Sequence, residues 1–156
     1  MNGRPDTSNA VIRPPIAWAL ALAAGFGLDW LYPLPFLPAS LPRVWCGAAV
    51  FGIGFVIAVW AIVMILRAGS HVETVKPTTS IVADGPYRFT RNPIYLGMLF
   101  GQIGLAIAFD SLWLLATMLP FYWVLRYGVI AREEVYLERK FGADYLSFKS
   151  RVRRWL

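Results

Sequence analysis

The sequence predicts an all-α integral membrane protein, with four transmembrane helices and a cytoplasmic, amphipathic helical segment at its C-terminus. Three observations carry this prediction. Hydrophobic residues make up 58% of the 156 residues and charged residues only 15%, whereas a soluble domain is about 45–50% apolar and about 25% charged. The apolar residues gather in four long stretches. The lysines and arginines flank these stretches instead of interrupting them, as expected when a charge in hydrocarbon is costly.

The N-terminal part is expected to contain a flexible cytoplasmic segment, residues 1–13, followed by a single domain over residues 14–156. The first apolar stretch, residues 16–32, ends in a proline cluster. A cleaved signal peptide is an alternative, but the apolar run continues to Trp30 and Tyr32, an aromatic pair typical of a membrane interface. We therefore interpret it as a membrane helix. The second stretch, residues 44–66, is long enough to span a bilayer.

The third and fourth stretches are predicted to form a tight hairpin. Residues 94–109 are rich in glycine, residues 112–130 carry Pro120 at a point where a kink is expected, and only two residues separate the stretches. Small residues four apart, such as Gly97 and Gly101 in the third stretch and Ala48 and Gly52 in the second, are typical of close helix packing in membranes.

Basic residues predict the orientation. Nearly all the lysines and arginines lie before the first stretch, between the second and third, or after the fourth. The loop between the first two stretches holds only Arg43, and the hairpin turn holds none. The positive-inside rule then places both termini in the cytoplasm and the protein in the cytoplasmic membrane. The net charge of +6 follows membrane topology, which argues against a nucleic-acid partner.

Two polar blocks on the cytoplasmic side carry the candidate chemistry. The first, residues 76–97, reads KPTTSIVADGPYRFTRNPIYLG, and the second, within residues 132–152, begins REEVYLERKFGADY. Tyr145, Phe148, Val152 and Trp155 then recur at helical spacing among basic residues, a pattern that suits an amphipathic helix on an anionic membrane surface.

In this order, on either side of a helical hairpin, the two blocks resemble the isoprenylcysteine carboxyl methyltransferase family and its phospholipid-methyltransferase relatives. Residues 91–97, RNPIYLG, correspond to the family's Arg-His-Pro-x-Tyr-x-Gly run, with Asn92 in place of histidine. The glutamate pair, the Phe-Gly-x-x-Tyr run and the pair Arg151 and Val152 match the second block. The resemblance covers about half the chain and implies an integral membrane enzyme that uses S-adenosylmethionine.

The resemblance implies a set of residues for the donor site: Tyr87, Arg91, Asn92, Pro93, Tyr95, Gly97, Glu133, Glu134 and Tyr145. Arginine suits the donor carboxylate, glutamate suits its ribose or ammonium, and tyrosine can face the sulfonium. Arg91 and Arg151 are the candidates for a catalytic role, Arg151 by orienting an anionic acceptor, and no metal is expected. Without the resemblance, the arginines would be interpreted as topology determinants and the glutamates as helix-dipole partners.

The sequence therefore predicts methyl transfer to a lipophilic small-molecule or prenylated acceptor, with membrane lipids as partners. A carboxylate or thiol acceptor is favoured, because the cytoplasmic face is rich in arginine and Asn92 supplies no imidazole base. An N-methyltransferase acting on a phospholipid or a small amine is one alternative. A non-enzymatic transporter or scaffold is another, although a proton-coupled transporter wants an ionisable residue at mid-membrane, and no span has one there.

Overall fold

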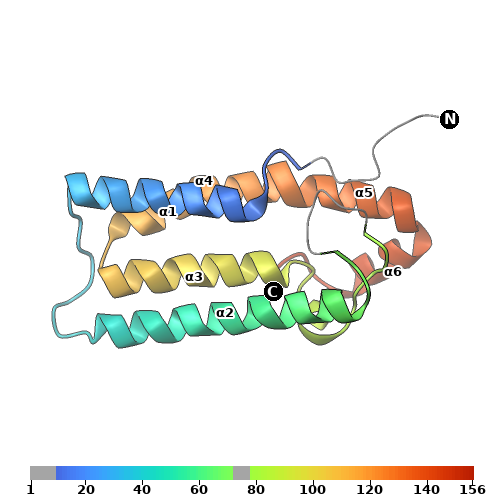
Figure 1. Cartoon of the computed structure of the whole chain (residues 1–156), viewed down its shortest axis with the longest axis horizontal. Helices are drawn as coiled ribbons and strands as arrows, with labels where there is room; N and C mark the ends of the chain where they lie inside the picture. The colour runs from blue at the N-terminus through green and yellow to red at the C-terminus, as the bar shows by residue number, and fades with distance from the viewer. Residues whose placement is uncertain (1–9, 72–77) are drawn as a thin grey trace.

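The computed structural model describes residues 10–71 and 78–156, and this part of the chain is all-helical without strands. Residues 1–9 of the expected flexible terminus and residues 76–77 of the first block lie outside the described residues. The four main helices, α1 (Pro14–Leu31), α2 (Arg43–Arg67), α3 (Pro93–Phe109) and α4 (Leu112–Trp123), run along the long axis of the molecule (Figure 1). By length and composition, α1, α2 and the continuous helical stretch from α4 can each cross a membrane, while α3 is a shorter apolar helix. The predicted fold class is thus confirmed.

Local sequence signals explain where the helices start. Helices α1 and α3 each begin at a proline, Pro14 and Pro93, a residue that fits the first helical turn because its missing N–H has no helical acceptor there. Ahead of α1, the Val11 N–H donates to the Gly128 carbonyl at 3.1 Å, which joins the chain before α1 to the helix that follows α4.

Asp110 holds together the end of the molecule that carries the hairpin turn. Its φ of 53° is left-handed, a conformation that aspartate tolerates better than most residues. Its carboxylate accepts the N–H groups of Phe36 and Leu37, each at 2.9 Å, and pairs with Arg43 at 3.0 Å. The loop between α1 and α2 is therefore fastened to the turn between α3 and α4.

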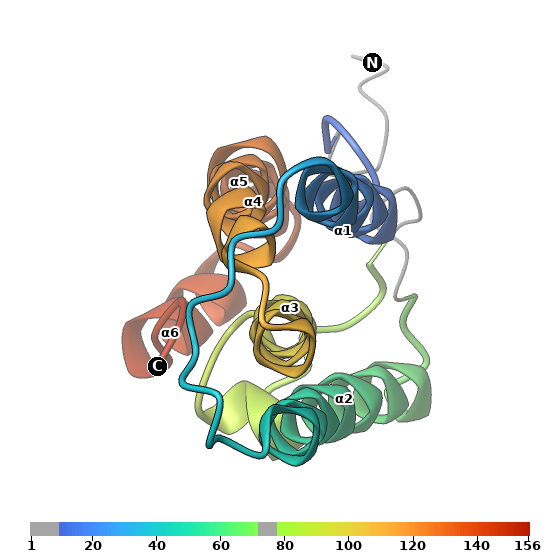
Figure 2. The same ribbon diagram turned by 90° about the vertical axis from the view of Figure 1, so that its left-hand side faces the viewer.

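The α2–α3 contact is the most extensive between helices, and glycines make it possible. Gly54 lies against Gly97 and Gly47 against Gly104, so close that a Cβ atom on any of the four would approach backbone within 2.7 Å. Seen end-on, α3 lies in the middle, with α2 on one side and α1 and α4 on the other (Figure 2). Gly52, by contrast, faces open space, so the expected close contact at the Ala48/Gly52 pair does not form at Gly52.

The expected fourth span continues as one helical stretch well past residue 130. Pro120 lies inside α4, and a π-helical segment, η2 (Val124–Ile130), leads into α5 (Ala131–Phe141). The whole stretch of 30 residues is about 45 Å long at about 1.5 Å per residue, against a hydrocarbon core of about 30 Å. The stretch is therefore longer than the hydrocarbon core, and its charges are concentrated in α5.

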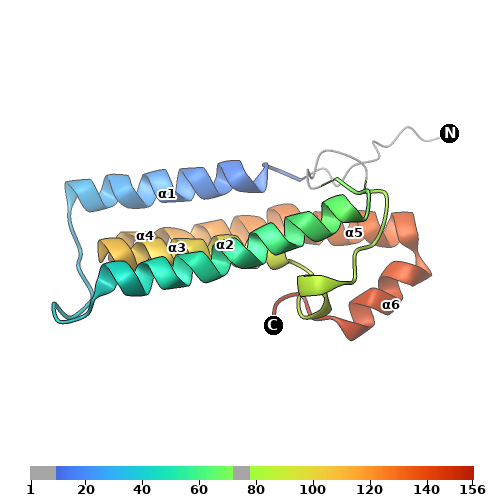
Figure 3. The same cartoon turned by 60° about the horizontal axis from the view of Figure 1, so that its bottom comes forward.

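Gly142, with a φ of 52°, ends α5, and α6 (Ala143–Arg151) then folds back beside it (Figure 3). The apolar face of α6 is buried within the protein: Tyr145 and Phe148 pack in a cluster with Ala61 of α2 and Tyr87. The sequence pattern suited a helix lying on a membrane surface, and the structure uses that face to cover the polar end of the bundle.

Candidate functional site

A cavity lies at the polar end of the bundle, where the start of α3 meets α5 and α6. Its cavity volume is about 160 Å³, below the roughly 300–1,000 Å³ that is usual for small-molecule sites, and the cavity opens to solvent. Its lining comes from both sequence blocks and from the end of α2: Ile65, Ser70, His71, Thr78, Ser80, Ile81, Val82, Tyr87, Arg91, Asn92, Pro93, Ile94, Tyr95, Ile130, Glu133, Glu134, Tyr136, Leu137, Tyr145 and Phe148.

A short helical turn, η1 (Gly85–Arg88), presents the first block to the cavity. Gly85 has a φ of 60°, and a Cβ atom there would come within 2.9 Å of Met64, so glycine allows the turn to lie against α2. Tyr87 is buried as a result. Burial, reinforced by the nearby Glu133 carboxyl, raises the pKa of Tyr87 well above its usual range, so this hydroxyl stays protonated as a donor.

Glu134 is the centre of an ion-pair cluster that joins three segments. Its carboxylate lies 3.3 Å from Arg91 of the first block and binds the Arg154 guanidinium through both oxygens, at 2.7 and 2.6 Å. The side chains of Arg91 and Glu134 are only 10% and 8% exposed, so desolvation is offset by ionic hydrogen bonds. The Arg91 Nε is buried and finds no hydrogen-bond partner within the described residues, which leaves one donor for a ligand.

Glu133 and Tyr95 form a second polar pair on the cavity wall. The Tyr95 hydroxyl donates to Glu133 Oε1 at 2.8 Å. Removal from water raises the pKa of Glu133 to about 7, against the lowering effect of the Tyr95 hydrogen bond, because a desolvated carboxylate is less stable than its neutral form. At neutral pH this carboxyl is poised between accepting and donating a proton.

Tyr145 of α6 closes the cavity above Arg91. Its hydroxyl accepts a hydrogen bond from Arg91 Nη1 at 3.5 Å. Mainly because the hydroxyl is buried, the pKa of Tyr145 is raised to about 12. Two other lining residues are joined by a hydrogen bond, in which the backbone N–H of Thr78 donates to the Tyr136 hydroxyl at 3.2 Å. The walls therefore combine the end of α2, the first block, the start of α5 and α6.

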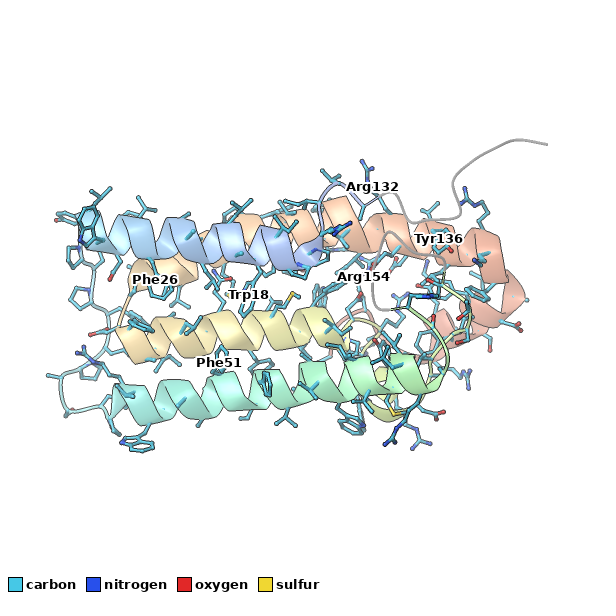
Figure 4. The ribbon with its side chains drawn as sticks, in the orientation of Figure 1. Trp18, Phe26, Phe51, Arg132, Tyr136 and Arg154 are labelled. Atoms are coloured by element: carbon cyan, nitrogen blue, oxygen red, sulfur yellow. The ribbon has the colours of Figure 1, made fainter. Side chains whose placement is uncertain are left out.

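The structure brings eight of the ten residues expected in the site to one cavity; only Gly97 and Arg151 are not among its lining residues. Gly97 packs on Gly54 of α2 instead. Arg151 is exposed, and its Nε donates to the Ser147 carbonyl at 3.2 Å. Arg154, which the sequence analysis did not single out, binds the Glu134 carboxylate, and it lies toward the same end of the molecule as Tyr136 (Figure 4). In the sequence it is one of several arginines in a basic tail, and nothing local distinguishes it.

Comparison with known proteins identifies a family. Residues 42–144 match the family described as phospholipid methyltransferase. An uncharacterized protein from Haemophilus influenzae is 56% identical over 36 residues, which are 23% of this chain and 57% of that protein, so the chain spans little more than half of that relative's length. No solved structure matches the chain. Because the family match extends over well more than half of its length, this chain belongs to the phospholipid methyltransferase family.

Proposed function

We propose that this protein is a membrane methyltransferase that uses S-adenosylmethionine to methylate a lipophilic acceptor. The observation that carries the proposal is one cavity lined by both sequence blocks, with Arg91, Glu134 and four tyrosines among its lining residues. The family match supports methyl transfer as the reaction class.

The residues present fit the chemistry of this donor. S-adenosylmethionine supplies a methyl group on a cationic sulfur, and the electron pair of the broken carbon–sulfur bond stays with the departing sulfur. Arg91, with its unpartnered Nε, suits the donor carboxylate through charge-assisted hydrogen bonds. Glu134 suits the ammonium or the ribose hydroxyls. Catalysis would come from positioning acceptor and donor in line, together with the electrostatics of the cavity.

The proposed site faces the cytoplasm, where the donor is made. The distribution of basic residues supports this orientation. Arg91 lines the cavity, and α5 and α6, which carry several basic residues, lie at the same end of the molecule (Figure 1). Asp110, Arg43 and the short loop between α1 and α2 would face the outside. Both termini would then be cytoplasmic.

The acceptor is proposed to be lipophilic, since apolar side chains from α2, α3 and η2 reach the cavity: Ile65, Ile94 and Ile130. A hydrophobic carboxylate or thiol, including a prenylated one, needs orientation more than deprotonation, and this remains the proposal from the sequence. Arg151 is exposed and is not among the residues that line the cavity, so its expected role in orienting an anionic acceptor gains no support from this geometry.

A second candidate acceptor is the amine of a phospholipid headgroup, and one observation favours it. An amine must lose a proton during methylation, and Glu133, with a pKa of about 7, is a suitable base on the cavity wall. The new nitrogen–carbon bond would form as the methyl–sulfur bond breaks, with the proton passing to Glu133. Asn92 supplies no such base.

The test is transfer of a labelled methyl group from S-adenosylmethionine by purified protein in detergent or nanodiscs. The acceptor panel contains hydrophobic carboxylates, prenylated thiols, phosphatidylethanolamine and water-soluble amines. Turnover of any lipophilic member supports the proposal, and its identity selects between the anionic and amine candidates. Failure to bind the donor, or turnover confined to water-soluble amines, would refute the proposal.

A further inference from the structure

The last five residues, 152–156, form a strap that returns from α6 to the start of α3. Val152, just after α6, has extended backbone with φ −119° and ψ 131°, and the carbonyls of the next two residues reach the segment just before α3. In the sequence this strap is an ordinary basic tail. In the structure it lies against the first block of the proposed donor site.

Backbone hydrogen bonds anchor the strap. The Arg91 N–H donates to the carbonyl of Arg153 at 2.9 Å. Thr90 Oγ1 and Asn92 Nδ2 both donate to the carbonyl of Arg154, at 3.1 and 2.9 Å. Thr90 and Asn92 are themselves buried, so these bonds are shielded from water. Three successive residues of the first block therefore hold two successive carbonyls of the strap.

An aromatic contact secures the far end of the strap. The Trp155 ring lies 5.6 Å from that of Tyr122, centroid to centroid, at an interplanar angle of 33°. Trp155 also packs against the core cluster that contains Tyr95 and Phe121. With anchors on both sides, the Cα position of Arg154 is set by α3 and α4, and its side chain reaches α5 from a defined point.

From this position Arg154 forms a bidentate ion pair with Glu134. Its Nε and Nη2 donate to the two different oxygens of the carboxylate, at 2.7 and 2.6 Å, which fixes the plane of that group. Each carboxylate oxygen has two lone pairs. The paired contact with Arg154 uses one on each oxygen and leaves capacity for Arg91 and for a ligand in the cavity.

We propose that Arg154 is a positioning residue of the methyl-donor site: held by the strap, it orients the Glu134 carboxylate that receives the donor. The assignment rests on the proposed function. Without Arg154, Arg91 is the one remaining guanidinium in contact with the Glu134 carboxylate within residues 10–71 and 78–156. Arg91 would then pair more closely with Glu134 and move away from the donor carboxylate. One substitution would thus weaken two contacts with the methyl donor, that of Arg91 and that of Glu134.

The test is the affinity of purified variants for S-adenosylhomocysteine, measured by titration calorimetry in detergent, with thermal unfolding as a check on folding. Arg154→Gln is expected to weaken binding roughly tenfold or more, the effect of losing a charge-assisted hydrogen bond. Arg154→Lys keeps the charge and is expected to recover little, because one ammonium cannot grip both oxygens. Arg88→Gln removes an exposed arginine of η1 and is expected to bind as the unaltered protein does.

A double-mutant cycle separates positioning from direct contact. In a Glu134→Gln background, adding Arg154→Gln is expected to change the affinity less than about twofold, since the group it positions is already altered. Wild-type affinity in Arg154→Gln, or its full independent effect in the Glu134→Gln background, would overturn the assignment. If Arg154→Gln does not fold, the Arg154→Lys affinity decides, and full recovery overturns it. No binding by the unaltered protein would refute the proposed function and this assignment together.

Discussion

Replacing Gly97 by alanine tests whether the α2–α3 contact depends on glycine. A Cβ atom at this position would lie 2.5 Å from the Gly54 carbonyl oxygen and 2.8 Å from the Ala58 Cβ. Ordinary contact begins at 3.4 Å, so the first distance must grow by 3.4 − 2.5 = 0.9 Å. The obstacle is backbone of α2 and cannot rotate away. The two helices must therefore move apart along a contact that otherwise brings their backbones together.

The expected loss is that of an overpacked core, about 1–3 kcal/mol. Alanine also favours the helix over glycine by about 1 kcal/mol, which would mask part of this loss in a simple comparison with the unaltered protein. Gly52→Ala is the matched control, because a Cβ atom there meets nothing within 4 Å. Both variants gain the same helix propensity, so the difference between them isolates the steric term.

The assay is reversible unfolding in mixed micelles, followed by circular dichroism as the denaturing detergent increases. Gly97→Ala is expected to have a free energy of unfolding about 1–3 kcal/mol below that of Gly52→Ala. Gly54→Ala, on the other side of the same contact, is expected to behave like Gly97→Ala. Equal stability of Gly97→Ala and Gly52→Ala would refute the close approach of the two helices.

Three further predictions concern the site and its orientation. Arg91→Ala and Glu134→Ala should each weaken S-adenosylmethionine binding by about 1.5–3 kcal/mol, roughly ten- to a hundredfold. Calorimetry on folded variants measures this loss of affinity. Unchanged affinity in both variants would remove these residues from the site. If the acceptor is an amine, turnover should rise as pH increases through about 7, where the Glu133 carboxyl becomes the ionised base. Glu133→Gln should abolish this rise while keeping the affinity for the donor. A rise that persists in the variant would contradict the role of Glu133 as the base. Reporter fusions at the C-terminus and in the loop after α2 should report a cytoplasmic location. A fusion in the loop between α1 and α2 should report an external location. An external C-terminus would contradict the orientation.

Much of the fold was predictable because its signals are local. Apolar length marks α1, α2 and α4, and the proline cluster and the two-residue turn mark where helices stop. The membership of the cavity was also largely predictable, since the two blocks that resemble a known family line it together. What these signals did not predict is the end of the fourth helix: the π-helical segment keeps the chain helical to Phe141, and such a segment has no reliable signature in one sequence.

The sequence by itself determined the helical class, the apolar spans and the two blocks that carry the chemistry, because hydropathy, proline and charge act over a few neighbouring residues. The tertiary structure alone decided which polar groups meet. Glu134 pairs with Arg154, twenty residues away, while Arg151 remains exposed, although both arginines belong to the same basic tail. That choice depends on Gly142 reversing the chain and on the strap binding back to Asn92. Contacts of this kind depend on the positions of several distant segments at once, and local pattern does not encode them.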